Sequence, residues 1–252
     1  MGKGASDKYA NYMTIRALED GLEAIVGSAN GEPIYYCIHS EGVWKKADMV
    51  TPAINAGDAI SFKAEITPNS TLGCGNFEIT RACALEGNCM SLLYGDNAEG
   101  QPMKAYGFYK LFNNCTRIRK VSKDFLPATT LANYCYSYMF NGVTQLTQPP
   151  DLPATTLANG CYHTMFSGCI YMYESPLLPA KNLVSQCYAQ MFYYCTGLKK
   201  ITAMFTTAPS SSYTSSWVSN VASTGMFVMS KNATWNVKGV NGIPSGWTVE
   251  KV

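Results

Sequence analysis

Residues 126–140 read Leu-Pro-Ala-Thr-Thr-Leu-Ala-Asn-Tyr-Cys-Tyr-Ser-Tyr-Met-Phe, and this stretch recurs twice in closely similar form. The copies begin at residues 126, 152 and 178, which places them 26 residues apart. A degenerate copy, Gly-Phe-Tyr-Lys-Leu-Phe, precedes them at residues 107–112. A fixed period of about 20–29 residues is typical of leucine-rich repeats, in which one unit cannot bury its apolar face but a stack can. The sequence therefore predicts a leucine-rich-repeat-like solenoid.

Apolar residues at equivalent positions of the copies are expected to form columns in the core. The first column is Ile118, Leu146, Met172 and Leu198, the second is Phe112, Phe140, Phe166 and Phe192, and the third is Leu131, Leu157 and Leu183. The Leu-Pro pair should keep the start of each unit extended, because proline fixes φ and disfavours a helical residue before it. Each unit should then add one short strand and a helical or 3₁₀ turn.

The segments on either side of the repeats follow other patterns. Residues 12–17, 33–38 and 59–64 are short β-favouring runs separated by glycine-containing turns, which predicts an immunoglobulin-like β-sandwich over residues 1–87. An amphipathic helix over residues 6–26 is the alternative, which the Asp20-Gly21 turn disfavours. The solenoid is expected over residues 88–205. Residues 206–252 lack the repeat and are predicted to cap it, with Trp217, Phe227, Trp235 and Trp247 shielding the last rung.

Composition narrows the classes of function for this mainly β chain with short helical turns. Hydrophobic residues make up 47% of the chain, charged residues only 14%, and the net charge is +2. No block of basic residues suggests nucleic-acid binding. No run approaches the roughly 20 apolar residues of a membrane span. The polar start also lacks the apolar centre of a signal peptide, so either a leader was replaced or export uses another route.

The ten cysteines are predicted to be mainly buried free thiols. One repeat position carries Cys135, Cys161 and Cys187, and another carries Cys115, Cys169 and Cys195 with Val143 in the second unit. Valine in place of cysteine indicates a position that requires a small apolar group, a role that free cysteine fills in cores. A Cys74–Cys83 disulfide is the alternative for the N-terminal cysteines.

No catalytic site is expected. Cys161 and His163 come closest to a nucleophilic pair, but the equivalents of His163 in the other units are Ser137 and Ala189, as at an exposed position. No carboxylate pair, glycine-rich phosphate loop or zinc-type cysteine spacing occurs, so neither a metal site nor a cofactor is expected.

The predicted binding surface consists of side chains that flank the first apolar column. Side chains alternate between the two faces of a strand, so the neighbours of a buried residue should point outward. They are Arg117, Gln145 and Tyr171 on one side, and Arg119, Thr147, Tyr173 and Lys199 on the other. Arginine and tyrosine are enriched at recognition hot spots, although an ordinary solvated face is the alternative. Other tyrosines could form a carbohydrate-stacking platform or pack the repeats, and Tyr136, Tyr162 and Tyr188 are expected to do the latter.

The repeat unit Leu-Pro-Ala-Thr-Thr-Leu…Cys-Tyr…Met-Phe resembles the leucine-rich-repeat surface proteins of gut Bacteroides, the BspA-like group. Residues 87–96 and 242–249 match as well, so the resemblance spans almost the whole chain. It implies a non-enzymatic adhesion protein at the cell surface, with a host or bacterial surface protein or glycan as partner. Similar repeats also suit tail proteins of phages, so a homo-oligomeric, structural or receptor-binding virion component is the alternative. An enzyme with an unrecognised site is a third class.

Overall fold

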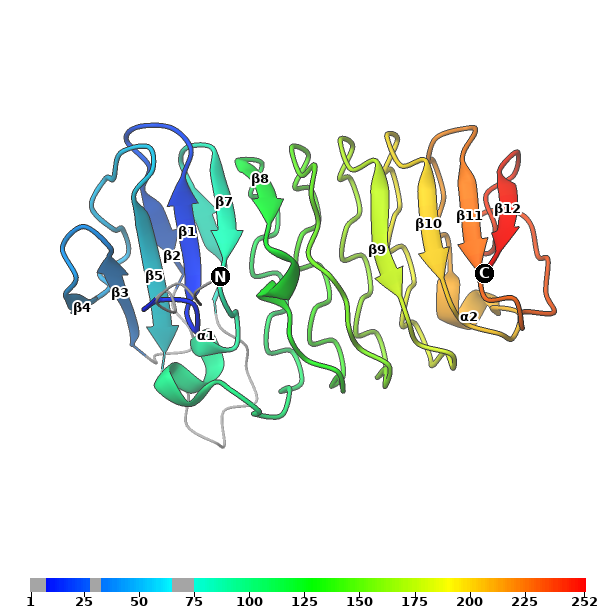
Figure 1. The fold of residues 1–252 in the computed structure, drawn as a ribbon, viewed down its shortest axis with the longest axis horizontal. Helices are drawn as coiled ribbons and strands as arrows, with labels where there is room; N and C mark the ends of the chain where they lie inside the picture. The colour runs from blue at the N-terminus through cyan, green and yellow to red at the C-terminus, as the bar shows by residue number, and fades with distance from the viewer. Residues whose placement is uncertain (1–7, 28–32, 65–74) are drawn as a thin grey trace, which may run out of the picture.

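The structure is a computed structural model that describes residues 8–27, 33–64 and 75–252. It is an elongated body with a mixed β-sheet at the N-terminal end and a stack of coils leading to the C-terminal end (Figure 1). The coils form a β-solenoid of about three turns with the 26-residue spacing, and helices are few and short. Within the described ranges, no helix has the length and apolar character needed to cross a membrane.

The N-terminal domain is built from two sheets, as a mainly β segment predicts. The larger has the strand order β4-β3-β5-β1-β7-β8, in which β8 (Ile118–Val121) already belongs to the repeats, and the smaller pairs β2 with β6. The N-terminal strands are β1 (Met13–Ala17), β2 (Ala24–Val26), β3 (Ile34–Ile38), β4 (Trp44–Lys46), β5 (Ala59–Ala64), β6 (Phe77–Ile79) and β7 (Cys83–Glu86). Phe62 and Phe77 join the two sheets in an edge-to-face contact with ring centroids 5.1 Å apart. Strands β1, β3 and β5 lie in the runs predicted for them, and the finer immunoglobulin-like assignment stays a prediction.

The sheet of the N-terminal domain continues into the solenoid. Strand β7 pairs in parallel with β8 (Ile118–Val121), the first strand of the repeats. Between them, the chain forms the short helix α1 (Ser91–Tyr94) and the 3₁₀ turn η1 (Gly95–Asn97), and a second 3₁₀ turn, η2 (Lys123–Phe125), follows β8. One continuous core of buried side chains runs from Met13 to Trp247, so the N-terminal sheet covers the first coil.

One wall of the solenoid is made of parallel strands. Strands β9 (Glu174–Leu178), β10 (Lys200–Ala203), β11 (Met226–Met229) and β12 (Thr248–Lys251) form a parallel sheet in the order β12-β11-β10-β9. An isolated parallel bridge between Lys120 and Gln148 links the coil of β8 to the next one. The short helix α2 (Ser211–Thr214) precedes β11. We call the side of the solenoid that contains these parallel strands and the bridge the strand wall.

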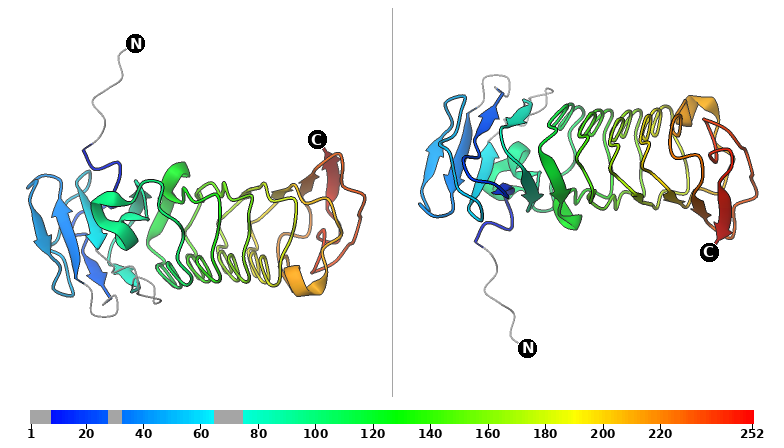
Figure 2. Two further views of the ribbon diagram at one scale, coloured as in Figure 1. Left: turned by 90° about the horizontal axis from the view of Figure 1, so that it is seen from below. Right: turned by 90° about the horizontal axis from the view of Figure 1, so that it is seen from above.

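The opposite wall consists of consecutive β-turns rather than the expected helical turn in each unit (Figure 2). This turn wall comprises residues 105–114, 133–142, 159–168 and 185–194. Successive N–H groups alternate between two acceptors: Cys135 N–H binds the Ala132 carbonyl in its own coil, whereas Tyr136 N–H binds the Cys161 carbonyl in the next coil. Every fourth residue has a positive φ, for example 54° at Tyr134 and 59° at Tyr138. This alternation cannot form a helix, because half of the N–H groups bond to the neighbouring coil.

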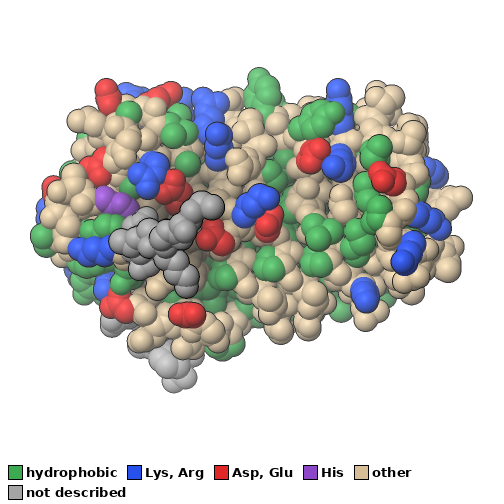
Figure 3. Space-filling model, viewed as in Figure 1, with side chains coloured by type: hydrophobic (Ala, Val, Ile, Leu, Met, Phe, Trp, Pro, Cys, Tyr) green, Lys and Arg blue, Asp and Glu red, His purple; other side chains and the backbone are tan. Residues whose placement is uncertain are grey.

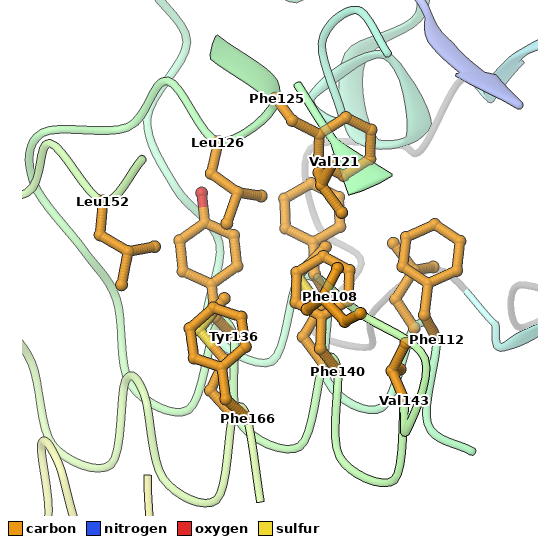
Figure 4. Close-up of a cluster of buried hydrophobic side chains, with 14 of the residues drawn as sticks. Phe108, Phe112, Val121, Phe125, Leu126, Tyr136, Phe140, Val143, Leu152 and Phe166 are labelled. Atoms are coloured by element: carbon orange, nitrogen blue, oxygen red, sulfur yellow. The ribbon is translucent and has the colours of Figure 1, made fainter. Parts of the chain in front are cut away.

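The apolar columns pack as stacked rings and aliphatic rungs between the two walls. Phe112, Phe140 and Phe166 stack face to face, with successive centroids 5.7 Å apart and planes within 9° of parallel (Figure 4). Phe192 continues the column at 6.1 Å. The column of Ile118, Leu146, Met172 and Leu198 is fully buried, as predicted. In the third column Leu131 is buried, but Leu157 and Leu183 are only partly buried and lie at the margin of the core.

A second ring column contains the tyrosines that follow the repeat cysteines. Phe108, Tyr136, Tyr162 and Tyr188 stack with centroids 5.7 to 5.9 Å apart, and their side chains are fully buried. The prediction that Tyr136, Tyr162 and Tyr188 serve packing is therefore confirmed. At the far end, Trp217 packs against Tyr188 and Phe192, while Phe227, Trp235 and Trp247 are buried behind it.

The repeat cysteines are free and buried, as predicted, and so are Cys37 and Cys83 in the N-terminal domain. Cys83 is among them, whereas its expected alternative partner, Cys74, lies outside the described residues. Burial raises the pKa of the Cys115, Cys135 and Cys195 thiols to about 12. The thiols therefore stay protonated and act as small apolar groups.

Tyr136 gives a test of the packed column. Its hydroxyl is buried and has no hydrogen-bond partner among the described residues, while the preceding coil carries Phe108 at the same place. Removing an unsatisfied buried hydroxyl should help folding, so we expect Tyr136→Phe to raise the free energy of unfolding by about 1 kcal/mol, measured by guanidinium titration. The control is Phe140→Ala, which should lower it by about 3–5 kcal/mol by leaving a cavity. A destabilised Tyr136→Phe variant would show that the hydroxyl is satisfied in solution.

The buried thiols predict a loss of stability at alkaline pH. Unfolded thiols ionise above about pH 9, while Cys115, Cys135 and Cys195 stay neutral in the folded chain until about pH 12. Because the folded pKa is the higher one, these groups leave stability unchanged below pH 9 and lower it from pH 9 towards 12. The limiting slope is about 1.4 kcal/mol per pH unit for each thiol.

Unfolding followed by tryptophan fluorescence between pH 8 and 11 measures this slope. The matched variant is Cys195→Val, because Val143 already occupies the equivalent place in the second unit. We expect a shallower slope for this variant. An unchanged slope would mean that burial of Cys195 does not contribute to the pH dependence of the free energy of unfolding.

Candidate binding site

The seven predicted residues lie along one edge of the solenoid, where the turn wall passes into the strand wall. We call Arg117, Arg119, Gln145, Thr147, Tyr171, Tyr173 and Lys199 the edge row. Of these, Arg119 lies within a strand, whereas the others precede the strand or bridge of their coil. The expectation that all of them alternate along strands is wrong for a local reason. Met172 N–H, for example, bonds to the Cys169 carbonyl in its own coil at 3.2 Å, so the turn continues up to the apolar column.

The first group of the edge row is held by hydrogen bonds between two neighbouring coils. A guanidinium nitrogen of Arg119 donates to the side-chain oxygen of Gln145. Thr147 donates both its N–H and its hydroxyl to the Arg119 carbonyl, at 2.9 and 3.0 Å. Arg119 is half-buried and Thr147 is exposed. The charge of Arg119 is therefore held in a fixed place at the surface.

The second group consists of Tyr171, Tyr173 and Lys199. The two tyrosine side chains are 57% and 56% exposed, on either side of the fully buried Met172. The Tyr173 carbonyl accepts the Lys199 N–H at 2.9 Å, and the Lys199 ammonium lies 5.8 Å from the centre of the Tyr173 ring. This exposure leaves both rings available to a partner, while the buried Met172 fixes the backbone between them.

Arg117 lies apart from these two groups, at the junction with the N-terminal domain. It lines a hollow of about 310 Å³ together with Asn76, Glu78 and Asn114, so a carboxylate shares its surroundings. Its carbonyl accepts the N–H of Cys83 at the start of β7. The structure therefore brings six of the seven residues into two groups on adjacent coils and places Arg117 at their N-terminal end.

The edge row carries three cationic side chains and no acidic one. The adjacent strand wall is closer to neutral, because Glu174 and Lys200 form an exposed ion pair at 3.5 Å. Hydrophobic side chains lie among isolated charges on this face of the molecule (Figure 3), and Leu177 on β9 and Met226 on β11 are among the exposed ones. A partner with negative potential and some apolar surface would be complementary to this edge.

The Cys161–His163 pair lacks the features of a nucleophilic site. Burial raises the pKa of Cys161 well above its ordinary value, so the reactive thiolate is disfavoured. His163 shares a hydrogen bond of 3.0 Å with the hydroxyl of the adjacent Thr164. Its side chain is half-buried rather than exposed as predicted, and burial lowers its pKa.

A second group of surface side chains was not assigned from the sequence. Tyr106, Tyr109, Tyr134, Tyr138 and His163 form a connected set of ring contacts on the turn wall. The four-residue spacing of Tyr134 and Tyr138 could have indicated it, because both flank the buried Tyr136. That spacing has meaning only once the turn geometry is known.

Searches of protein-family models, curated proteins and solved structures find no match to this chain.

Proposed function

We propose that the chain is a non-enzymatic binding protein of a cell surface, which presents the edge row to a surface protein or glycan of a partner. The observation that carries the proposal is the pair of Tyr171 and Tyr173, each more than half exposed on a backbone fixed by a buried residue. Rigid, exposed aromatic side chains beside cations are typical of recognition hot spots.

The solenoid architecture supports this function because it sets surface groups at regular intervals on a rigid frame. A hydrogen bond joins the side chains of Arg119 and Gln145 in two neighbouring coils. In the next two coils, the Lys199 ammonium lies near the Tyr173 ring. Binding to such a prearranged surface orders few additional side chains, which lowers the entropic cost of association. The positive charge favours a partner with an acidic face.

The resemblance of the repeat to BspA-like surface proteins of Bacteroides is the second support. It rests on the Leu-Pro-Ala-Thr-Thr-Leu…Cys-Tyr…Met-Phe unit and makes adhesion the expected role. This support is an argument from analogy, because one fold can carry many functions. Binding measurements on edge-row variants therefore decide whether the proposal holds.

Binding to an array of immobilised extracellular-matrix proteins and surface glycans tests the proposal. We expect the chain to bind at least one member, and we expect Tyr171→Ala, Tyr173→Ala and Arg119→Ala together to weaken that binding by about tenfold or more. Raising the salt concentration should weaken binding as well, because the edge row is cationic.

The matched control combines Tyr194→Asn with Lys231→Ala, which removes an exposed tyrosine and an exposed lysine away from the edge row. Asparagine is chosen because Tyr194 has a φ of 58°, a conformation that asparagine tolerates. This control should bind as the parent chain does. Equal binding by the triple variant would refute the edge row as the recognition surface.

A further inference from the structure

The ring cluster on the turn wall lies on the other side of the coils from the strand wall. It consists of Tyr106, Tyr109, Lys110, Tyr134, Tyr138 and His163, and we call it the turn platform. Tyr106 and Tyr134 stack with centroids 5.2 Å apart and planes 13° from parallel. Tyr109 makes edge contacts with Tyr106 and Tyr138, each at 5.9 Å, and Tyr138 lies 5.3 Å from His163. The Tyr106 side chain is 43% exposed and the other four rings are half-buried, so the rings form one connected cluster across three coils at the surface of the turn wall.

Backbone conformation separates this cluster from ordinary core packing. Tyr106, Tyr134 and Tyr138 have φ values of 57°, 54° and 59°, in the left-handed region that favours glycine and asparagine. Elsewhere on the same wall this conformation is adopted by three glycines and by six other residues, which are Gly142, Gly160, Gly168, Lys110, Asn114, Thr164, Gln186, Gln190 and Tyr194. A tyrosine at such a position is disfavoured locally and points away from the core, so the fold alone does not call for it.

The position of the Tyr134 ring is fixed by its neighbours in the next two coils. A Cβ atom on Gly160 would lie 2.3 Å from a carbon of the Tyr134 ring, so the ring rests directly against the glycine backbone. The Tyr134 hydroxyl donates to the Gln186 side-chain oxygen at 3.0 Å. Gly160 thus provides the space that the Tyr134 ring occupies.

The charge on the turn wall is sparse and of one sign. Lys110 is the one Lys, Arg, Asp or Glu in residues 105–114, 133–142, 159–168 and 185–194. Its ammonium lies 5.1 Å from the centre of the Tyr109 ring and 5.6 Å from that of Tyr138. Apart from the imidazole of His163, the other exposed or half-exposed polar side chains on this wall are amides and hydroxyls, such as Asn133, Asn141 and Gln190. The wall therefore presents aromatic rings, groups that can both donate and accept hydrogen bonds, and one cation.

We propose that the turn platform is a second binding site, separate from the edge row, for an acidic polysaccharide whose pyranose rings stack on Tyr106, Tyr134 and Tyr138. The apolar face of a pyranose ring can lie on a tyrosine ring, and its hydroxyls match the surrounding amides. A carboxylate on the sugar would pair with Lys110. The absence of acidic side chains from the four turn segments leaves that carboxylate unopposed.

A single-stranded nucleic acid also stacks on aromatic rings, but it needs cations along its backbone. One lysine in four turn segments does not supply them. An acidic polysaccharide with spaced carboxylates is the better match to a surface of many rings and one cation.

Affinity electrophoresis of the full chain in native gels that contain hyaluronate, which has a carboxylate on every second sugar, tests the proposal, with gels containing dextran as the neutral comparison. We expect hyaluronate to retard the chain and dextran to retard it less. Tyr106→Asn combined with Tyr134→Asn should weaken the retardation by about tenfold, as expected for loss of two stacking rings. Asparagine keeps the left-handed conformation accessible, so the variant should fold.

Two further variants separate ring position from charge. Gly160→Asn keeps every aromatic ring, but its Cβ atom would clash with the Tyr134 ring and displace it, so this variant should bind more weakly. Lys110→Asn should remove the difference between hyaluronate and dextran. Thermal unfolding of each variant verifies that the fold is retained.

The control is Tyr194→Asn combined with Lys231→Ala, which removes an exposed tyrosine and an exposed lysine outside both the turn platform and the edge row. It should be retarded as the parent chain is. Unchanged retardation of the Tyr106→Asn, Tyr134→Asn variant would overturn the proposal, as would no retardation of the parent chain. Equal retention by single-stranded DNA would overturn the choice of ligand. None of these variants changes an edge-row residue, so the experiment tests the turn platform separately from the edge row.

Discussion

The structure depends on the hydrogen bonding of the turn wall. Alternate N–H groups bond within their own coil and to the next coil, as Cys135 and Tyr136 show. This arrangement satisfies the backbone of a segment that is neither helix nor strand, and it fixes the separation of the coils. The stacked rings follow from it, because side chains at equivalent positions are then brought to the 5.7 Å spacing of Phe112, Phe140 and Phe166.

The solenoid, its period and its core could be predicted because they leave a periodic apolar pattern in the sequence. Phe140 and Tyr136 recur with the repeat and are fully buried. The substitution of Val143 for cysteine indicated a buried thiol column, and Cys169 and Cys195 are buried and free. These inferences concern which groups avoid water, a property that residue type largely determines.

The turn wall and the exact place of the strands could not be predicted, because both depend on hydrogen bonds between coils. The left-handed positions are hidden when Tyr134 or Tyr138 occupies them, and they become visible only where glycine does, as at Gly142. The edge row was identified from the burial of Met172, which was correct. Its assignment to strands failed because the N–H of Met172 is used within its own coil.

The repeat itself separates residues that the fold requires from residues that it merely permits. Inward positions stay aromatic through four coils, from Phe112 to Phe192. The outward position of Tyr106 and Tyr134 becomes Gly160 in the third coil and Gln186 in the fourth, with the same positive φ in each. The backbone at this position therefore accommodates small, amide and aromatic residues. Two stacked tyrosines at a position where glycine would fit more easily are therefore residues that the backbone permits rather than requires.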